Sequence, residues 1–404
     1  MNDKGPGATV ALVVFALVGV VFAAVSTADF IAFLDRQVHA VTCSFVPGLG
    51  AADTTGVSGC HAVLMSPYSA VLRTWTWGGI PISLAALAVF AFLAFRAADL
   101  VVRHTTADRH ETAFLVAATL LPVVVSIAYF LIAVLKVGSV CKLCVGIYVA
   151  SLGAFVSAIV AHRRAVRGAE PSAVLWGRHA VAFLEGVVFV AVPVLLYLGL
   201  KPPYTDSFAK CGELIRPEDR YGVRVKLTDA PSGIPAIEVL DPLCPACKAF
   251  SERLAASGFS DRLQRELVLF PLDKECNWMV GESLHPGACA VSEAVLCGGV
   301  KAREVLEWAF ANQQELRDLG KDTAAVYARI RTRFPELGDC LGNPAVRAKL
   351  NRSLRWAVAN SLPVQTPQLF VRDRKVCEED TDLGLEFVLA RTLSGGRPDG
   401  RPGR

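Results

Sequence analysis

The sequence has little charge for its length. Asp, Glu, Lys and Arg together make up 19% of its 404 residues, whereas apolar residues make up 53%. A mean hydropathy of +0.43 is too high for a wholly soluble chain of this size, so part of the chain is predicted to lie in a membrane. The net charge is only +4 and no basic stripe is interleaved with aromatic residues, so no nucleic-acid partner is expected.

Histidine is also scarce, with seven residues, and neither of the two Cys-x-x-Cys pairs has a histidine beside it. Val145 follows the first pair and Lys248 the second, which excludes the Cys-x-x-Cys-His motif that attaches c-type haem. A zinc centre needs four ligands in one tetrahedral set, and neither pair has a supporting histidine cluster. We therefore predict no metal site, and interpret His285, near Cys289, as a surface histidine beside a disulfide.

Five apolar segments reach or approach the roughly 20 residues that a membrane-spanning helix requires. They lie approximately at residues 9–28, 79–100, 112–135, 140–161 and 180–200. The connections that follow the second and fourth segments are rich in arginine, so the positive-inside rule places both in the cytoplasm. The N-terminus is then cytoplasmic, and the chain beyond residue 200 lies on the outer side. The alternative for the first segment, a cleaved signal peptide, leaves the remaining topology unchanged.

The chain beyond residue 200 has a mixed rather than an apolar character. After a polar linker at 201–221, strands are predicted at 234–240, 267–270 and 366–371, with a helical block over about 281–362. Asn343 as the cap and Pro344 as the first residue predict one helix of this block. The tail, 394–404, consists mostly of Gly, Pro and Arg and is predicted to be disordered.

Two Cys-x-x-Cys pairs carry the expected chemistry. Cys141 and Cys144 begin the fourth apolar segment, and Cys244 and Cys247 follow the strand predicted at 234–240. At a helix N-terminus both sulfurs share one face, and the helix dipole lowers the pKa of the outer thiol and favours the reactive thiolate. A purely structural disulfide between Cys141 and Cys144 is not expected, because it would close too short a loop to stabilise the fold.

Two further cysteines, Cys43 and Cys60, lie in the outer loop between the first and second apolar segments. The spacer of 16 residues between them is rich in Gly and small residues, and it spans up to about 50 Å when extended. Cys43 can therefore reach partners far from Cys60. Segment 61–72 has apolar residues near helical spacing and is predicted to lie on the membrane surface as a half-helix.

The remaining six cysteines are even in number and allow fifteen pairings. They are Cys211, Cys276, Cys289, Cys297, Cys340 and Cys377. We expect disulfides between Cys276 and Cys289 and between Cys297 and Cys340, each stabilising the fold by about 2–4 kcal/mol.

The segment Cys244-Pro245-Ala246-Cys247 after a strand resembles the active site of the thioredoxin superfamily. Its Cys-Pro-x-Cys form and the long helical insertion are similar to the DsbA and DsbG branch. Thr366-Pro367 matches the position at which that superfamily keeps a cis-proline facing the dithiol. The resemblance covers 223–393 and implies that Cys244 is the exposed nucleophile, Cys247 the resolving thiol, and Thr366 and Pro367 substrate-positioning residues.

The four N-terminal cysteines resemble those of the vitamin K epoxide reductase family over about residues 10–161. Their order, Cys43 and Cys60 in a loop and then Cys141 and Cys144 at the start of the fourth helix, is the family's order, although the spacer in the loop is longer. The resemblance implies that Cys43 exchanges with the soluble domain and Cys60 with Cys141. Cys144 would then face a quinone of the menaquinone, ubiquinone or phylloquinone type.

Finer features agree with this resemblance. Ser66 falls six residues after Cys60, Gly79-Ile80-Pro81-Ile82-Ser83 opens the next helix, and Tyr148 comes four residues after Cys144. Residues i and i+4 share one helix face, so Cys144 and Tyr148 are predicted to bind the quinone, with Ser66 on its other oxygen. The alternative roles are an interfacial anchor for Tyr148 and a helix-turn hydroxyl for Ser66.

The predicted fold is a membrane bundle of five transmembrane helices with a four-helix quinone-binding core, followed by a soluble α/β thioredoxin-like domain with a helical insertion. The predicted boundaries are a membrane domain at 1–165, the fifth helix and a linker at 166–222, the thioredoxin-like domain at 223–393 and the tail at 394–404.

The predicted function is a membrane thiol oxidase that promotes disulfide formation in exported proteins with reduced cysteines. Electrons would pass from the Cys244 pair through Cys43 and Cys60 to the Cys141 pair and then to a lipid quinone. The protein would be integral to a bacterial cytoplasmic membrane, with the thioredoxin-like domain outside. The alternatives are a protein that exports reducing equivalents to an outer isomerase, which would need a cysteine reachable from the cytoplasm, and a non-catalytic, disulfide-stapled anchor.

Overall fold

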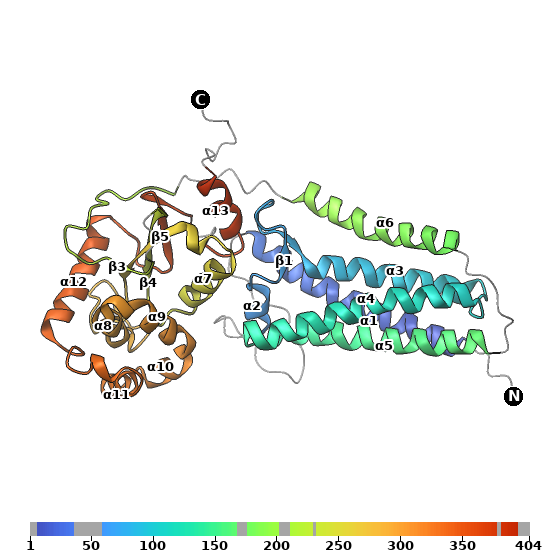
Figure 1. The fold of residues 1–404 in the computed structure, drawn as a ribbon, viewed down its shortest axis with the longest axis horizontal. Helices are drawn as coiled ribbons and strands as arrows, with labels where there is room; N and C mark the ends of the chain where they lie inside the picture. The colour runs from blue at the N-terminus through green and yellow to red at the C-terminus, as the bar shows by residue number, and fades with distance from the viewer. Residues whose placement is uncertain are drawn as a thin grey trace, which may run out of the picture. The chain divides into compact units, whose positions relative to one another are not determined.

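The computed structural model describes residues 6–35, 59–167, 176–201, 211–228, 232–377 and 381–394. Cys43 and residues 395–404 of the predicted tail lie outside these ranges. The chain divides into two compact units, one of Met1–Leu72 with Gly79–Pro202 and the other of Arg73–Gly78 with Pro203–Arg404. Most of their helices and some of their strands are labelled in Figure 1.

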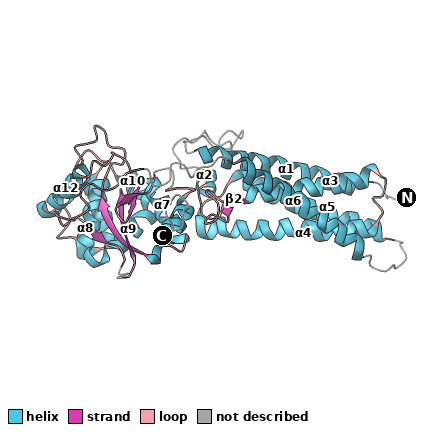
Figure 2. Cartoon of the chain, turned by 90° about the horizontal axis from the view of Figure 1, so that it is seen from above, coloured by secondary structure: helices cyan, strands magenta, loops and turns pink. Residues whose placement is uncertain are grey.

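The first unit is helical, and among its described residues five helices are long and apolar enough to cross a membrane. They are α1 (Gly7–Ala32), α3 (Ile82–Val102), α4 (Arg109–Ile132, continued by a π-helical turn at Ala133–Val137), α5 (Lys142–Val166) and α6 (Trp176–Leu200). These helices confirm the five predicted spans. Helix α1 packs against α3 and α5, α4 packs against α5, and α6 lies along α3 (Figures 1 and 2).

Small residues allow the membrane helices to approach one another closely. A Cβ atom added to Gly153 on α5 would lie 2.4 Å from the Phe15 ring on α1, and one added to Gly146 would lie 2.7 Å from Phe22. In lipid, helices associate through such close van der Waals packing, because the tails offer no hydrophobic driving force. The glycines therefore fix the α1–α5 contact that places the first turn of α5.

The half-helix predicted at 61–72 is correct only for its first residues. Helix α2 (Gly59–Leu64) is followed by a turn and by strand β1 (Ala70–Val71), which pairs antiparallel with β2 (Ile80–Pro81). The prediction was wrong beyond Leu64 because Pro67 disfavours helical backbone at the residue before it. Ser66 instead closes a turn, with its backbone N–H donating to Val63 O.

The second unit is built around a five-stranded sheet of order β3-β5-β4-β6-β7. The strands are β3 (Val225–Lys226), β4 (Ile234–Leu240), β5 (Leu263–Leu269), β6 (Gln368–Val371) and β7 (Arg374–Lys375). Strand β4 runs parallel to β5 and antiparallel to β6, and β3 and β7 add antiparallel edges. Figure 2 shows these strands in magenta among the helices of the unit.

Helices connect and cover this sheet. Helix α7 (Pro245–Ala256) joins β4 to β5, a helical insertion separates β5 from β6, and α13 (Leu385–Leu393) follows β7. The insertion contains α8 (Ala288–Gly298), α9 (Ala302–Ala311), α10 (Gln313–Leu319), α11 (Thr323–Arg333) and α12 (Pro344–Ala359). Short 3-10 turns lie at Phe33–Asp35, Ser260–Arg262, Gly299–Lys301 and Pro335–Leu337. The predicted cap of α12 is confirmed, because the Asn343 side chain accepts a hydrogen bond from Ala345 N–H.

A buried ion pair crosses the two central strands. Arg265 on β5 approaches Glu238 on β4 with Nε–Oε1 at 2.5 Å and a second bond at 3.1 Å. The Glu238 side chain is fully buried and that of Arg265 is 7% exposed. Each charge therefore depends on the other for compensation.

Three disulfides cross-link segments of the second unit among its described residues. Cys276–Cys289 and Cys297–Cys340 are bonded as predicted. Cys211 and Cys377, 166 residues apart, form the third pair described in this unit. The last bond ties the start of the unit to the segment that follows β7.

Candidate functional site

The first dithiol opens α5. Cys141 has extended backbone and is the cap residue of this helix, and Gly138, with φ of 68°, turns the chain out of the preceding π-helical turn. Both Cys141 and Cys144 are free thiols, and their side chains are hydrogen-bonded to each other. The dithiol therefore has the helix-start geometry that its spacing predicted.

Helix α2 brings Cys60 to this dithiol. Cys60, Cys141 and Leu143 form one small buried cluster, with Cys144 packed against it. A Cβ atom on Gly59 would lie only 2.5 Å from Val140 O, so α2 rests directly on the backbone before Cys141. Cys60 is disulfide-bonded. The structure thus brings together three of the four cysteines predicted for the membrane relay, while Cys43 lies outside the described residues.

A cavity of about 120 Å³ lies against these sulfurs. Its lining includes the apolar residues Phe30, Ile82, Ala86, Val125, Leu143 and Ile147, the cysteines Cys60, Cys141 and Cys144, and the hydroxyl-bearing residues Ser66, Ser126, Tyr129 and Tyr148. Mostly apolar walls with a few converging polar groups are typical of a site for a small organic ring.

The two predicted hydroxyl residues line this cavity in different ways. The Ser66 hydroxyl donates to Val63 O at 2.7 Å, so it serves as the helix-turn hydroxyl considered above and directs its proton away from a ligand. Tyr148 is held edge-on to the Phe130 ring, with centroids 6.2 Å apart. Among the described residues, no group forms a hydrogen bond with the Tyr148 or Tyr129 hydroxyl, so both are available as donors to a ligand carbonyl.

Asp29, Ser126 and Tyr129 are among the polar lining residues that were missed from the sequence. Asp29 on α1 is 7% exposed, and Ser126 and Tyr129 share one face of α4. Ser126 also exchanges a hydrogen bond with Ser151 on α5, 3.0 Å away. Their position within apolar segments could have identified them, because ionisable and polar residues in membrane segments usually face the bundle interior or a cavity.

The second dithiol begins α7 directly after β4. Cys244 caps the helix and Pro245 is its first residue, a position at which the missing N–H costs nothing. The Cys244 Sγ–H donates to Thr366 O at 3.7 Å, and the Thr366–Pro367 peptide bond is cis. The structure therefore brings Thr366 to the dithiol, and Pro367 follows it across the cis peptide bond. With the β4-α7-β5 unit followed by antiparallel β6, β7 and α13, this confirms the predicted thioredoxin-like fold.

The two thiols of this site differ electrostatically. A hydrogen bond from the Cys247 thiol lowers the pKa of Cys244 to about 6, although burial and the Asp241 carboxylate act in the opposite direction. Burial raises the pKa of Cys247, which has no exposed surface. Cys244 is therefore the thiol that ionises at neutral pH. Its side chain was predicted to be exposed, but the residue is only 5% exposed, because Cys244 lies just after the buried end of β4.

His285 differs from its prediction as a surface residue. Its side chain is only 12% exposed, and Nδ1 lies 2.7 Å from Oδ2 of the buried Asp241. The pairing was not foreseen because 44 residues separate the two side chains. Within the part of the chain that the structure describes, no group of three His, Cys, Asp or Glu residues is arranged to hold a metal ion.

Comparison with known proteins gives two similarities. Residues 10–159 match the vitamin K epoxide reductase family. Among solved structures, the crystal structure of the oxidoreductase DsbA from Xylella fastidiosa is similar at 19% identity, over 43% of this chain and 96% of that chain, with a TM-score of 0.30. A search of curated proteins found no match.

Proposed function

We propose that the protein is a quinone-dependent thiol oxidase, because residues 10–159 match the vitamin K epoxide reductase family and a thioredoxin-like domain follows them. It would introduce disulfides into exported proteins. Electrons would pass from Cys244 and Cys247 through Cys43 and Cys60 to the dithiol at the start of α5, and from there to a lipid quinone.

One observation carries this proposal. A single cavity is lined by Cys60, Cys141 and Cys144 together with Tyr148. A relay through these sulfurs can therefore end at a ligand in the same cavity. The apolar walls suit the ring of a quinone, and the tyrosine hydroxyl suits its carbonyl oxygen.

The thiol chemistry balances at each stage. A substrate thiolate attacks Cys244 in the Cys244–Cys247 disulfide and displaces Cys247, and a second substrate thiolate then displaces Cys244 to complete the substrate disulfide. The resulting dithiol holds two electrons and two protons. It would reduce a disulfide between Cys43 and Cys60, and that pair would then reduce a disulfide between Cys141 and Cys144, with two thiol–disulfide exchanges for each transfer. Each exchange forms one S–S bond and breaks another.

The last protein stage is the free dithiol of Cys141 and Cys144. A bound quinone would accept the two electrons and two protons that this dithiol releases. Cys144 lies one turn into α5 and lines the cavity, and Tyr148 lies on the same face one turn further. Tyr148 would orient a carbonyl oxygen by hydrogen bonding, while the apolar lining excludes water that would compete for this bond.

The orientation in the membrane is part of the proposal. Arginines gather where α3 ends and α4 and α6 begin, and Arg178 bonds both Asp108 and Glu111 there at 3.1 and 3.0 Å. By the positive-inside rule this end is cytoplasmic, so the opposite end, with the dithiol of α5, faces outward. In a bacterial cytoplasmic membrane, the substrates would then be exported proteins. Fusion holds the thioredoxin-like domain at a millimolar effective concentration, so encounter need not limit turnover.

The test is Cys144→Ala in the purified full-length chain, supplied with a reduced dithiol substrate and a soluble quinone. We expect quinol formation to stop and Cys244 and Cys247 to accumulate as thiols, as determined by alkylation and peptide mass spectrometry. Val149→Ala is the matched control, because Val149 is on the same helix but 58% exposed. Continued quinone reduction by Cys144→Ala would refute the proposed path, and an inactive wild-type chain would favour the non-catalytic anchor.

A further inference from the structure

The thioredoxin-like domain contains a buried ion pair beside its nucleophile. His285 is the only histidine beyond residue 179, and its Nδ1 is 2.7 Å from Asp241 Oδ2. The Asp241 side chain is fully buried and that of His285 is nearly so. A carboxylate this deeply buried needs a compensating partner, and His285 is the basic side chain in contact with it.

The backbone places Asp241 close to Cys244. Asp241 directly follows β4, and its carbonyl accepts a hydrogen bond from Cys244 N–H at 3.1 Å. Its carboxylate accepts hydrogen bonds from the N–H groups of Leu243 at 2.7 Å and Leu272 at 2.8 Å. These bonds fix the carboxylate within the turn that carries the nucleophile.

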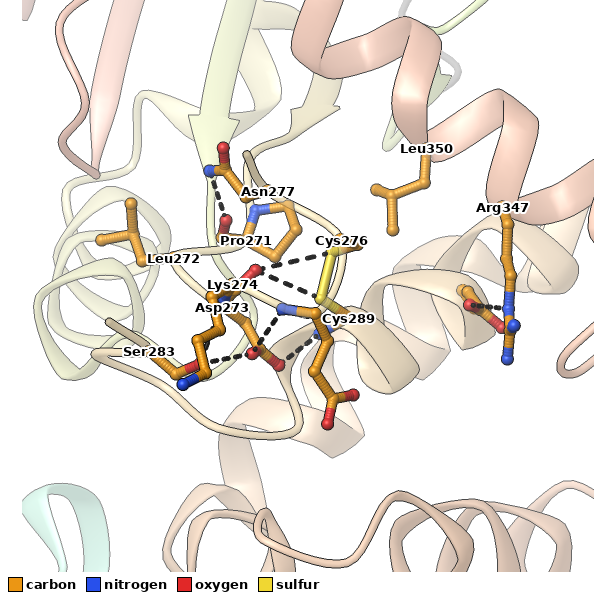
Figure 3. The surroundings of a disulfide bond; sticks show 12 residues. Pro271, Leu272, Asp273, Lys274, Cys276, Asn277, Ser283, Cys289, Arg347 and Leu350 are labelled. Atoms are coloured by element: carbon orange, nitrogen blue, oxygen red, sulfur yellow. Dashed lines mark hydrogen bonds and ion pairs between the residues drawn. A yellow bond between two sulfur atoms is a disulfide. The ribbon is translucent and has the colours of Figure 1, made fainter. Parts of the chain in front are cut away.

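A loop closed by a disulfide places His285 next to this turn. The N–H groups of Leu284 and His285 both donate to Leu272 O, and the Cys276–Cys289 disulfide closes the loop around them. Figure 3 shows how Asp273 fastens the same loop from within. Its carboxylate accepts hydrogen bonds from Ser283 Oγ at 2.8 Å and from Gly287 N–H at 2.9 Å, and also bonds Cys289 N–H. The position of the imidazole is therefore defined by several independent constraints.

The two members of the pair act on Cys244 in opposite directions. The negative charge of Asp241 raises the pKa of Cys244, whereas the positive charge of His285 lowers it. The residues between the two cysteines, Pro245 and Ala246, have no charge with which to stabilise a thiolate. The other ionisable groups that act on this pair are Cys247 and, from α10, Arg317, whose charge opposes protonation of His285.

We propose that His285 is a positioning residue that cancels the charge of Asp241 and thereby keeps the nucleophile Cys244 in its thiolate form. This proposal rests on the role of Cys244 in the proposed function. In this proposal the Cys276–Cys289 loop positions the positive charge of His285 near the dithiol. The two residues between the cysteines of that dithiol carry no charge.

The consequence concerns the release of substrate. When the second substrate thiolate attacks the mixed disulfide, the bond between Cys244 and the substrate sulfur breaks and Cys244 leaves with the electron pair. A thiol of lower pKa leaves faster, and a more stable thiolate makes the domain a stronger oxidant. His285 therefore favours transfer of the disulfide to the substrate, because without it the uncompensated charge of Asp241 would disfavour the Cys244 thiolate.

The experiment compares His285→Gln with Asp241→Asn/His285→Gln in the full-length chain. The alkylation rate of Cys244 is measured against pH by mass spectrometry of its peptide. The midpoint, about 6 in the wild type, should rise by about one unit in His285→Gln, a tenfold loss in the ionisation constant. At pH 7 the dithiol should become an about fivefold weaker oxidant against glutathione, or about 20 mV. The double variant, whose pair is again neutral, should return close to the wild-type midpoint.

A structural role for His285 makes a different prediction. It would lower the thermal stability of both variants and leave the two midpoints alike, and that result would overturn the proposal. An unchanged midpoint in a folded His285→Gln chain would also overturn it. Since alkylation of Cys244 requires no quinone, a wild-type chain without quinone reductase activity would refute the proposed function while leaving this measurement intact.

Discussion

Gly59 is the residue at which a single methyl group should interrupt the proposed relay. Its backbone is not in the left-handed region, so an alanine at this position needs no unfavourable φ angle. The helix propensity of alanine would stabilise α2 by up to about 1 kcal/mol. The added Cβ, however, would lie 2.5 Å from Val140 O, and ordinary contact begins at 3.4 Å. About 0.9 Å must therefore open between α2 and the segment that leads to Cys141.

The expected loss follows from this displacement. Thiol–disulfide exchange between Cys60 and Cys141 requires the sulfurs in line, and a misplacement of about 1 Å can cost about 10²-fold in rate. We expect Gly59→Ala to reduce quinone about 10²-fold more slowly with a dithiol substrate. Rapid alkylation during turnover should find Cys244 reduced and the Cys141–Cys144 pair oxidised.

The matched control is Gly199→Ala, because a Cβ on this membrane-helix glycine would meet no atom within 4 Å. It should retain wild-type turnover. If Gly59→Ala folds and turns over within about twofold of the wild type, contact between α2 and the Cys141 segment is not part of the electron path, and this reasoning is refuted.

Other expectations concern single groups. Arg265→Leu leaves the charge of Glu238 buried without its partner, and should lower the free energy of unfolding, measured by pulse proteolysis, by about 3–5 kcal/mol. The control Arg303→Leu removes an exposed ion pair and should change the free energy of unfolding by less than about 0.5 kcal/mol. Equal effects would contradict the buried-pair argument. Tyr148→Phe removes one neutral hydrogen-bond donor and should slow quinone reduction about 2- to 10-fold, and no change would exclude the carbonyl contact. Alkylation of Cys244 should quicken as pH rises through about 6, because the depressed pKa makes the thiolate dominant above that value, and a midpoint near 8.5 would contradict this assignment.

Much of the fold follows from local patterns. The five membrane helices were predictable because continuous apolar sequence must form hydrogen bonds within its own segment in lipid. Strand β4 begins and ends where the short apolar pattern of Ile234 to Leu240 predicted a buried strand, and α12 begins at its Asn343–Pro344 signal. The Cys-x-x-Cys spacing likewise identified both dithiols, because a helix start requires only neighbouring residues.

The features that the sequence did not predict depend on contacts between residues that are distant along the chain. His285 has no local feature that distinguishes it from a surface histidine, and only closure of the 272–289 loop brings it to Asp241. Asp29 and Tyr129 line one cavity from different helices, an arrangement that no periodicity within either helix specifies. The end of α2 differs from its prediction for a local reason, because Pro67 disfavours helical backbone before it although the apolar spacing continues beyond Leu64.

Counting electrons tests the central claim most directly. The full-length chain is mildly reduced so that Cys43 and Cys60, Cys141 and Cys144, and Cys244 and Cys247 are all thiols, then mixed anaerobically with excess quinone. Three quinols per chain are expected, one for each dithiol, and only one in Cys60→Ala, where the dithiol of α5 alone can deliver its electrons. A Cys60→Ala chain that forms two quinols, which is all that its two remaining dithiols can supply, would show that electrons bypass the loop and would contradict the proposed relay.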